Sequence, residues 1–290
     1  MLLRLEGRGL FNSAAIVARA DRKEAVGLAK DLSDYLNSKK MPVFLEQTLA
    51  KRLGRPEAAL TLEKMRTDLV ITIGGDGTIL RTCLQLPKPE PPILAINMGV
   101  RGFLAEVPPK EGITAVEKCL KGEFTLERCM KIGASIGKKR LPAALNEVFV
   151  TSHAPAKLLY AKIWKDNTAV AESRADGFVI ASQVGSTGYS LSGGGPVLDP
   201  EVNAFVLTPV TPLTMFHPIV FSSRSTLTIE LIKPKRAVVV LDGHYTTEIK
   251  PTCLRIEVAK SEYESSFVRF GQNFYRRLKG RLLFSRGENL

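Results

Sequence analysis

The first 125 residues alternate short apolar runs with stretches in which apolar residues recur at helical spacing. The apolar runs predict four strands, at 14–20, 41–46, 68–74 and 92–99. The run at 68–74 is apolar throughout, as in a strand that is covered on both faces. Helices are predicted at 21–40, with Asp21 as the N-cap, and at 55–65, with Pro56 at its start. Strands separated by helices indicate a parallel, doubly wound sheet.

Beyond about residue 125 the pattern changes to short runs in which apolar and polar residues alternate, with turn residues between them. This pattern predicts an all-β region, either a sandwich or two stacked sheets. Helical spacing returns at 271–284. We therefore expect an α/β domain over 1–125, joined by a C-terminal helix within 270–290, and a β-sandwich domain over 126–269.

Composition and charge narrow the classes of partner. The 290 residues are 44% hydrophobic, enough for a sizeable core, and the net charge of +12 fits nucleic acid, a membrane surface or a polyanionic small molecule. No basic run has interleaved aromatic residues, which disfavours nucleic acid. No apolar run approaches the roughly 18 residues of a transmembrane helix. The four cysteines form no C-x-x-C pair, so we expect reduced thiols in a soluble cytoplasmic protein.

A glycine-rich turn follows the apolar run at 68–74. Its sequence, GGDGT, comprises Gly74, Gly75, Asp76, Gly77 and Thr78. Ligands bind at the carboxyl edge of parallel sheets, and glycines let backbone N–H groups approach a phosphate closely. Asp76 could then accept or orient the proton of a hydroxyl that receives a phosphoryl group. An ordinary turn with an aspartate cap remains the alternative. The P-loop and G-x-G-x-x-G patterns are absent.

A second candidate site lies in the β region, where residues 174–200 combine many glycines and hydroxyl residues around a strand. The polar turn at 185–190 could hydrogen-bond a ribose or phosphate, although a flexible loop is the alternative. Asn146 and Glu147 begin another strand and could read a base edge or ribose hydroxyls, but for the pair taken alone an ordinary turn and strand is the better explanation. The three histidines are isolated in the sequence and are more typical of structural positions.

Taken together, these motifs resemble the ATP-NAD kinase family. They are GGDGT, INMGVRGFLAE, NE, a DG followed by GSTGYSLSGGGP, and TPVTPLTMFHPIV, in that order between about residues 68 and 245. GGDGT is also found in diacylglycerol kinases, sphingosine kinases and phosphofructokinases, whereas the NE pair and the GSTGYSLSGGGP block are more specific. The first 65 residues match only in their βαβ pattern.

The resemblance implies transfer of the γ-phosphoryl of ATP to the 2′-hydroxyl of the adenosine ribose of NAD, giving NADP, with Mg²⁺ or another divalent ion. It implies that Asp76 is the proton acceptor and that Gly74, Gly75, Gly77 and Thr78 hold the phosphate donor. The positions implied to contact NAD are Asp76, Gly77, Asn146, Glu147, Lys157, Arg174, Asp176, Thr187, Gly188, Tyr189, Ser190, Leu191, Ser192 and His244. Gly188 departs from the alanine common in bacterial members, which implies a small change in pocket shape. Homodimers or homotetramers whose subunits complete each other's NAD sites are also implied.

Two other functions are compatible with parts of this pattern. A lipid kinase could use the same GGDGT turn, but the polar GSTGYS block argues against a lipid pocket. A non-catalytic NADP sensor could keep the pocket, but it would not need Asp76. The choice between ATP and polyphosphate as donor, between NAD and NADH as acceptor, and the residues that bind the metal stay open.

Overall fold

The computed structural model describes residues 2–4, 11–99, 102–154, 156–271, 274, 275 and 278. The chain divides into two compact units, one comprising 1–128 with 265–290 and the other 129–264. Two long strands, β7 (Thr125–Ile136) and β18 (Arg255–Arg269), continue from one unit into the other. The helix expected within 270–290 lies outside the described residues, apart from a few isolated positions.

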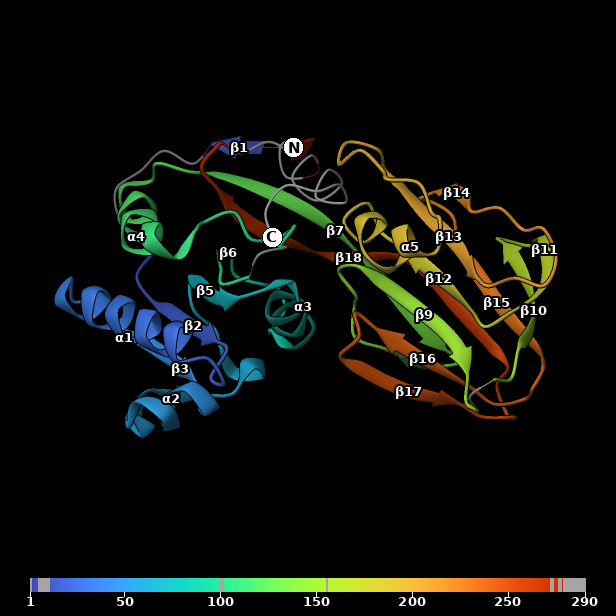
Figure 1. Cartoon of the computed structure of the whole chain (residues 1–290), viewed down its shortest axis with the longest axis horizontal. Helices are drawn as coiled ribbons and strands as arrows, with labels where there is room; N and C mark the ends of the chain where they lie inside the picture. The colour runs from blue at the N-terminus through green and yellow to red at the C-terminus, as the bar shows by residue number, and fades with distance from the viewer. Residues whose placement is uncertain are drawn as a thin grey trace, which may run out of the picture. The chain divides into compact units, whose positions relative to one another are not determined.

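The first unit is built on a parallel sheet with helices on both of its faces (Figure 1). Its strands are β2 (Ala14–Ala18), β3 (Val43–Glu46), β4 (Ala59–Leu60), β5 (Leu69–Gly74) and β6 (Ile93–Asn97), in the spatial order β6-β5-β2-β3-β4. Its helices are α1 (Lys23–Ser38), α2 (Gln47–Leu53), α3 (Asp76–Gln85) and α4 (Gly112–Lys121). Short strand β1 (Leu2–Arg4) pairs with β7, and the end of β18 pairs with β6. This arrangement confirms the doubly wound sheet.

Two local predictions for this unit were wrong. Residues 55–65 form no α-helix but two 3-10 turns, Pro56–Ala58 and Leu62–Lys64, on either side of β4. Pairing of β4 with β3 at the edge of the sheet satisfies backbone groups that a helix would have satisfied internally. Asp21 is not the N-cap of α1, because the helix begins at Lys23 and Asp21 pairs with Arg19 instead.

The second unit consists of two antiparallel sheets, as the alternating runs predicted. One contains β10 (Leu159–Lys165), β11 (Thr168–Ala175), β15 (Leu227–Lys233) and the first part of β18, in the order β11-β10-β15-β18. The other contains β9 (Glu147–Ser152), β12 (Gly177–Ala181), β13 (Ala204–Val210), β14 (Ile219–Ser222), β16 (Ala237–Leu241) and β17 (Tyr245–Ile249), in the order β14-β13-β12-β9-β16-β17. Strand β8 (Lys139–Arg140) forms a hairpin with β7, and helix α5 (Tyr189–Ser192) follows β12 after a 3-10 turn, Gly185–Thr187.

The register of the six-stranded sheet determines which segments of the second unit meet. Ala181, at the end of β12, pairs with Glu147, at the start of β9. Leu241, at the end of β16, pairs with Val148. The segment before β9, the segment after β12 and the turn after β16 therefore lie at the same end of this sheet.

Candidate active site

The glycine turn lies between β5 and α3, at the carboxyl edge of the parallel sheet. Gly75 is the N-cap residue of α3, and Asp76 is its first residue, so Asp76 is not the helix cap. A Cβ on Gly74 would lie 2.3 Å from Thr78 Oγ1, whereas a Cβ on Gly75 would meet no atom of the described residues within 4 Å. Packing therefore requires a glycine at position 74, while Gly75 leaves open space beside the N-terminus of a helix.

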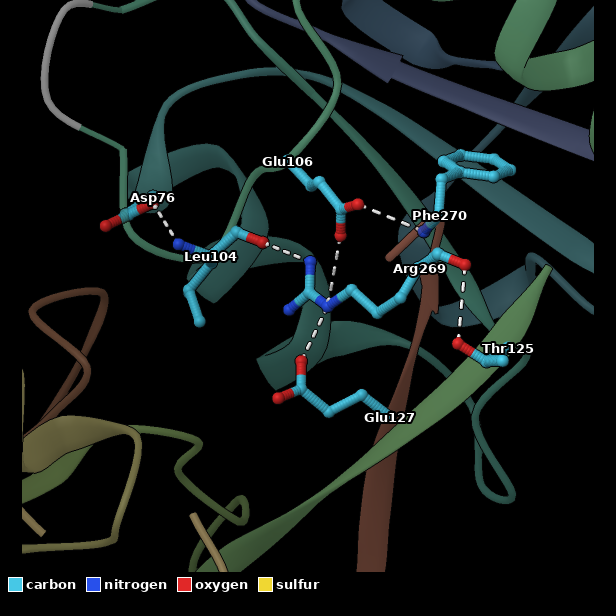
Figure 2. Close-up of polar contacts among 7 residues, drawn as sticks. All are labelled: Asp76, Leu104, Glu106, Thr125, Glu127, Arg269 and Phe270. Atoms are coloured by element: carbon cyan, nitrogen blue, oxygen red, sulfur yellow. Dashed lines mark hydrogen bonds and ion pairs between the residues drawn. The ribbon is translucent and has the colours of Figure 1, made fainter. Parts of the chain in front are cut away.

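The carboxylate of Asp76 is directed to the loop that follows β6. It accepts hydrogen bonds from the backbone N–H of Phe103, at 3.1 Å and 3.0 Å. It also accepts one from the backbone N–H of Leu104, at 3.1 Å (Figure 2). Asp76 is half-buried. Backbone donors from another segment thus set the orientation of this carboxylate.

Two arginines near the turn were not found from the sequence. Arg19 follows β2, and its Cγ would lie 3.3 Å from a Cβ on Gly74. Arg22 Nη1 donates to the carbonyl oxygen of Met98 at 3.4 Å, and Met98 N–H in turn donates to Gly74 O at 2.9 Å. The available signal was that Arg19 lies at the end of the strand predicted at 14–20 and Arg22 just after it, because β2 is next to β5 in the sheet.

In the second unit, a buried aspartate holds the segment that carries Asn146 and Glu147. The carboxylate of Asp242, which is 2% exposed, accepts backbone N–H groups from Leu145 at 2.7 Å, Asn146 at 2.8 Å and Glu147 at 3.0 Å. Sequence reasoning missed Asp242. The Asp-Gly pair between two alternating runs was the signal, because it is typical of a tight hairpin turn.

That hairpin turn also places His244. Asp242 and Gly243 both have positive φ, 49° and 68°. This conformation, which aspartate and glycine tolerate better than most residues, lets His244 Nδ1 lie 2.6 Å from the carbonyl oxygen of Asp242. Asp242 therefore contacts both the Asn146–Glu147 segment and the exposed His244.

The glycine-rich segment after β12 packs directly against Asn146. A Cβ on Gly185 would lie 2.0 Å from Asn146 O, so only glycine fits there. A Cβ on Gly188 would lie 3.3 Å from both Asn146 Nδ2 and Glu147 Oε2. Ser182 Oγ donates to Leu145 O at 2.6 Å and adds a further contact between the two segments.

Several hydroxyls of this block have partners within the protein. Ser186 Oγ and Thr187 Oγ1 donate to the carbonyl oxygens three residues before them, and Ser190 Oγ lies 2.7 Å from Thr208 Oγ1. All three side chains are buried. Tyr189, by contrast, is 41% exposed, and Ser192 is exposed. The block thus acts partly as scaffold.

Two buried polar atoms at the start of β9 have no hydrogen-bond partner among the described residues. They are Asn146 Oδ1 and Glu147 Oε2. Burial, and then the negative charge of Asp242, raise the pKa of Glu147 to about 8. Burial also raises the pKa of Asp242, while three backbone N–H groups and the buried Lys131 act in the opposite direction. Unpartnered buried polar atoms are costly, so this pair is suited to a polar ligand.

Replacement of Glu147 by glutamine should change how stability depends on pH. The pKa of Glu147 is higher in the folded chain, about 8, than its ordinary value of 4.5. The contribution of the Glu147 side chain to the free energy of unfolding is therefore complete below about pH 4.5 and is lost as pH rises to about 8. Glu147→Gln resembles the protonated side chain at every pH, so it should be more stable than the wild type at pH 9, by a few kcal/mol, and nearly equal at pH 5.

Urea unfolding at several pH values measures this difference. The exposed Glu201→Gln is the matched control and should follow the wild type at every pH. A parallel pH dependence of Glu147→Gln and the wild type would show that Glu147 ionises normally in the folded chain.

The remaining predicted residues lie elsewhere in the second unit. Asp176 precedes β12, at the opposite end of this strand from Ala181 and Glu147, about 17 Å away at roughly 3.3 Å per residue. The Asp176 carboxylate accepts a hydrogen bond from Thr211 Oγ1. Arg174 lies over the ring of Tyr160, 4.9 Å from its centroid. Lys157 is exposed in the loop before β10. The structure of one chain therefore does not bring these residues to Asn146 and Glu147.

Neither a metal cluster nor a membrane span is found within the described part of the chain. No group of three or more histidine, cysteine, aspartate or glutamate side chains there could hold a metal ion. No described helix is both long and apolar enough to cross a membrane.

The glycine turn of the first unit suits phosphates, and the Asn146–Glu147 segment of the second unit suits a polar ring. A glycine turn at the carboxyl edge of a parallel sheet is the usual place for phosphates in α/β proteins. The unpartnered amide and carboxyl oxygens in the second unit suit ribose hydroxyls or a base edge. These features place the chain among nucleotide-binding proteins.

Comparison with known proteins specifies the class further. Residues 14–124 match the model of the ATP-NAD kinase N-terminal domain, and residues 145–270 match that of the C-terminal domain. The chain is 39% identical to an NAD kinase of Methanothermobacter thermautotrophicus over 92% of this chain and 95% of that one. It is 37% identical to an NAD kinase of Thermococcus sibiricus over 90% and 95%. The chain belongs to the ATP-NAD kinase family.

Solved structures agree. An NAD kinase from Archaeoglobus fulgidus in complex with ATP is 30% identical, with a TM-score of 0.76 over 93% of this chain and 98% of that one. A yeast NADH kinase complexed with NADH has a TM-score of 0.89 at 22% identity, over 100% of this chain and 92% of that one, which shows the shared fold.

Proposed function

We propose that this protein is an NAD kinase, which transfers the γ-phosphoryl group of ATP to the 2′-hydroxyl of the adenosine ribose of NAD and so forms NADP. The observation that carries the proposal is a pair of buried atoms in a chain of this family, Asn146 Oδ1 and Glu147 Oε2, which have no hydrogen-bond partner in the described part of the chain. The relatives named NAD kinase and the relative in complex with ATP support the choice of substrates.

The glycine turn would receive the phosphate donor. Gly74, Gly75, Gly77 and Thr78 would present backbone N–H groups to the phosphates, and the open space beside Gly75 supports this role. Arg19 and Arg22, near the turn, would neutralise phosphate charge. Asp76 would accept or orient the proton of the 2′-hydroxyl, in a reaction that depends mainly on positioning and charge stabilisation.

The second unit would bind NAD. Asn146 Oδ1 can accept a hydrogen bond, and Glu147, whose pKa is raised to about 8, is mainly protonated at neutral pH and can donate one. Tyr189, Ser192 and His244 are exposed and would contact NAD directly. Among the other predicted positions, Thr187 and Ser190 are buried and would support the pocket, while Gly188 and Leu191 would line it.

A divalent ion, Mg²⁺ in our proposal, would accompany ATP. Mg²⁺ usually keeps several waters and binds substrate phosphates with one or two carboxylates. The phosphates of ATP and water molecules would therefore supply most of the ligands of the ion. Asp76 is the carboxylate at the turn. The ion would neutralise charge that develops on the phosphates.

We further infer a homodimer or homotetramer. The separation of Lys157, Arg174 and Asp176 from Glu147 within one chain supports a pocket that a second copy completes with these residues.

A cytoplasmic location is also proposed, with domains corresponding to 1–125 plus 270–290 and 126–269. The Cys119 thiol, whose pKa burial raises to about 12, fits the inert thiols of a reducing compartment.

One assay tests the proposed function. Pure protein is incubated with NAD, Mg²⁺ and either ATP or polyphosphate, and NADP is measured with an NADP-specific dehydrogenase. We expect NADP with ATP, and no product from NAD that lacks the 2′-hydroxyl on the adenosine ribose. Phosphorylation of diacylglycerol or a sphingoid base instead would identify a lipid kinase, and tight NADP binding without turnover would identify a sensor.

A further inference from the structure

We infer that Arg269 is a positioning residue for the phosphoryl transfer, which holds the backbone of Leu104 and through it the carboxylate of Asp76. This inference rests on the proposed function of Asp76. It concerns the first unit only, and sequence reasoning did not identify any of its supporting side chains.

The contacts form a continuous path from β18 to the glycine turn (Figure 2). Arg269 is the last residue of β18, and its side chain is 5% exposed. Its Nη1 donates to the carbonyl oxygen of Leu104 at 2.8 Å. The N–H of the same Leu104 donates to Asp76 Oδ1 at 3.1 Å. The Arg269 guanidinium thus holds the carbonyl group of Leu104, while the N–H group of Leu104 orients the Asp76 carboxylate.

Two carboxylates hold the guanidinium itself. Arg269 Nε lies 2.6 Å from Glu127 Oε2 and 3.8 Å from Glu106 Oε2. Glu106 Oε1 also accepts the backbone N–H of Phe270 at 3.0 Å, so this carboxylate contacts the chain directly after Arg269. The planar, rigid fork of arginine can address a carbonyl and a carboxylate at once, which a lysine ammonium does with less geometric control.

Stability alone is a weak reason for this arrangement. Glu106 is 4% exposed at its side chain and Arg269 is similarly buried, so both lose hydration. A buried ion pair often stabilises no better than apolar residues of similar volume, because desolvation offsets the attraction. What charged groups do supply is directional hydrogen bonding, here to the carbonyl oxygen of Leu104, whose own N–H donates to Asp76. A substitution far from the reacting atoms can slow a reaction severely if it displaces a catalytic group by even about an ångström.

Arg269→Lys is the test variant, because it keeps the positive charge but loses the fork. We expect kcat to fall about tenfold, while KM for NAD and for ATP stay within about twofold. Arg255→Lys makes the same change on the same strand, at an exposed arginine that pairs with Glu230, and should leave kcat unchanged. Urea unfolding of each variant separates a loss of stability from a loss of turnover.

The decisive measurement is the double variant Asp76→Asn with Arg269→Lys. If Arg269 acts through Asp76, Arg269→Lys lowers kcat in the wild type but not in the Asp76→Asn background. An equal loss in both backgrounds, or wild-type kcat in folded Arg269→Lys, overturns the inference. The proposed function fails separately, if the wild type makes no NADP or if Asp76→Asn keeps full turnover.

A second variant covers the case in which Arg269→Lys does not fold. Glu127→Gln loosens the contact at Arg269 Nε and has an acceptor of the same shape. We expect a smaller fall in kcat, again absent in the Asp76→Asn background. Wild-type kcat in Glu127→Gln, with Arg269→Lys unfolded, would assign the network to stability alone and overturn the inference.

Discussion

The Asp76→Asn variant should fold and bind NAD, yet its kcat should be lower than that of the wild type by about 100-fold or more, the usual scale for a lost general base. A side-chain amide keeps one oxygen acceptor for the N–H groups of Phe103 and Leu104, so much of the loop position should remain. The amide cannot take up the proton of the ribose hydroxyl. Steady-state kinetics, together with NAD binding by calorimetry, would separate these effects.

Asp68→Asn is the matched control for this variant. Asp68 directly precedes β5, at the opposite end from the glycine turn, and its Oδ2 accepts the backbone N–H of Asn12 at 2.7 Å. The same substitution at a backbone-anchoring aspartate should therefore lower stability without changing kcat. Near-wild-type turnover in folded Asp76→Asn would remove Asp76 from the mechanism.

The variants Asn146→Ala and Glu147→Ala should act mainly on NAD. Each substitution removes a buried polar group that has no partner in the described part of the chain and that we assign to the ligand. A lost hydrogen bond to a buried polar ligand costs about 1–3 kcal/mol, so KM for NAD should rise about 5- to 150-fold. KM for ATP should change much less, because the donor would be held by the glycine turn. Initial rates with each substrate varied in turn measure both constants.

Two exposed neighbours provide controls for this pair. Glu201 and Asn203 lie in the turn before β13, and their side chains are exposed. Glu201→Ala and Asn203→Ala should leave both KM values unchanged. A rise in KM for ATP in the Asn146 and Glu147 variants, with KM for NAD unchanged, would mean that these residues serve the other substrate.

Much of the fold follows from local pattern. The four apolar runs predicted in the first 125 residues correspond to β2, β3, β5 and β6, and the alternating runs beyond them form antiparallel sheets. Periodicity succeeds here because burial of one face, or of both, directly constrains neighbouring residues. It failed at 55–65, where the pairing of Ala59 and Leu60 with β3 outweighed a helical pattern.

The location of the candidate residues also depended on local signals. Asp76 follows an apolar strand in a glycine turn, and parallel-sheet topology places that turn at the ligand-binding edge. Asn146 and Glu147 were visible only as a weak pair in the sequence. Their significance depends on Oδ1 and Oε2 being buried without a hydrogen-bond partner among the described residues, which is a property of the packed structure.

The sequence by itself determined strands β2, β3, β5 and β6 and helix α1, the change from α/β to all-β, and the position of the glycine turn. Only the tertiary structure decided which polar groups hold the candidate residues. Asp242 reaches Leu145 across 97 residues, and Arg269 reaches Leu104 across 165. Hydrophobic periodicity determines which faces are buried, but a buried polar side chain must find its partner in whichever distant segment the fold brings within hydrogen-bond distance.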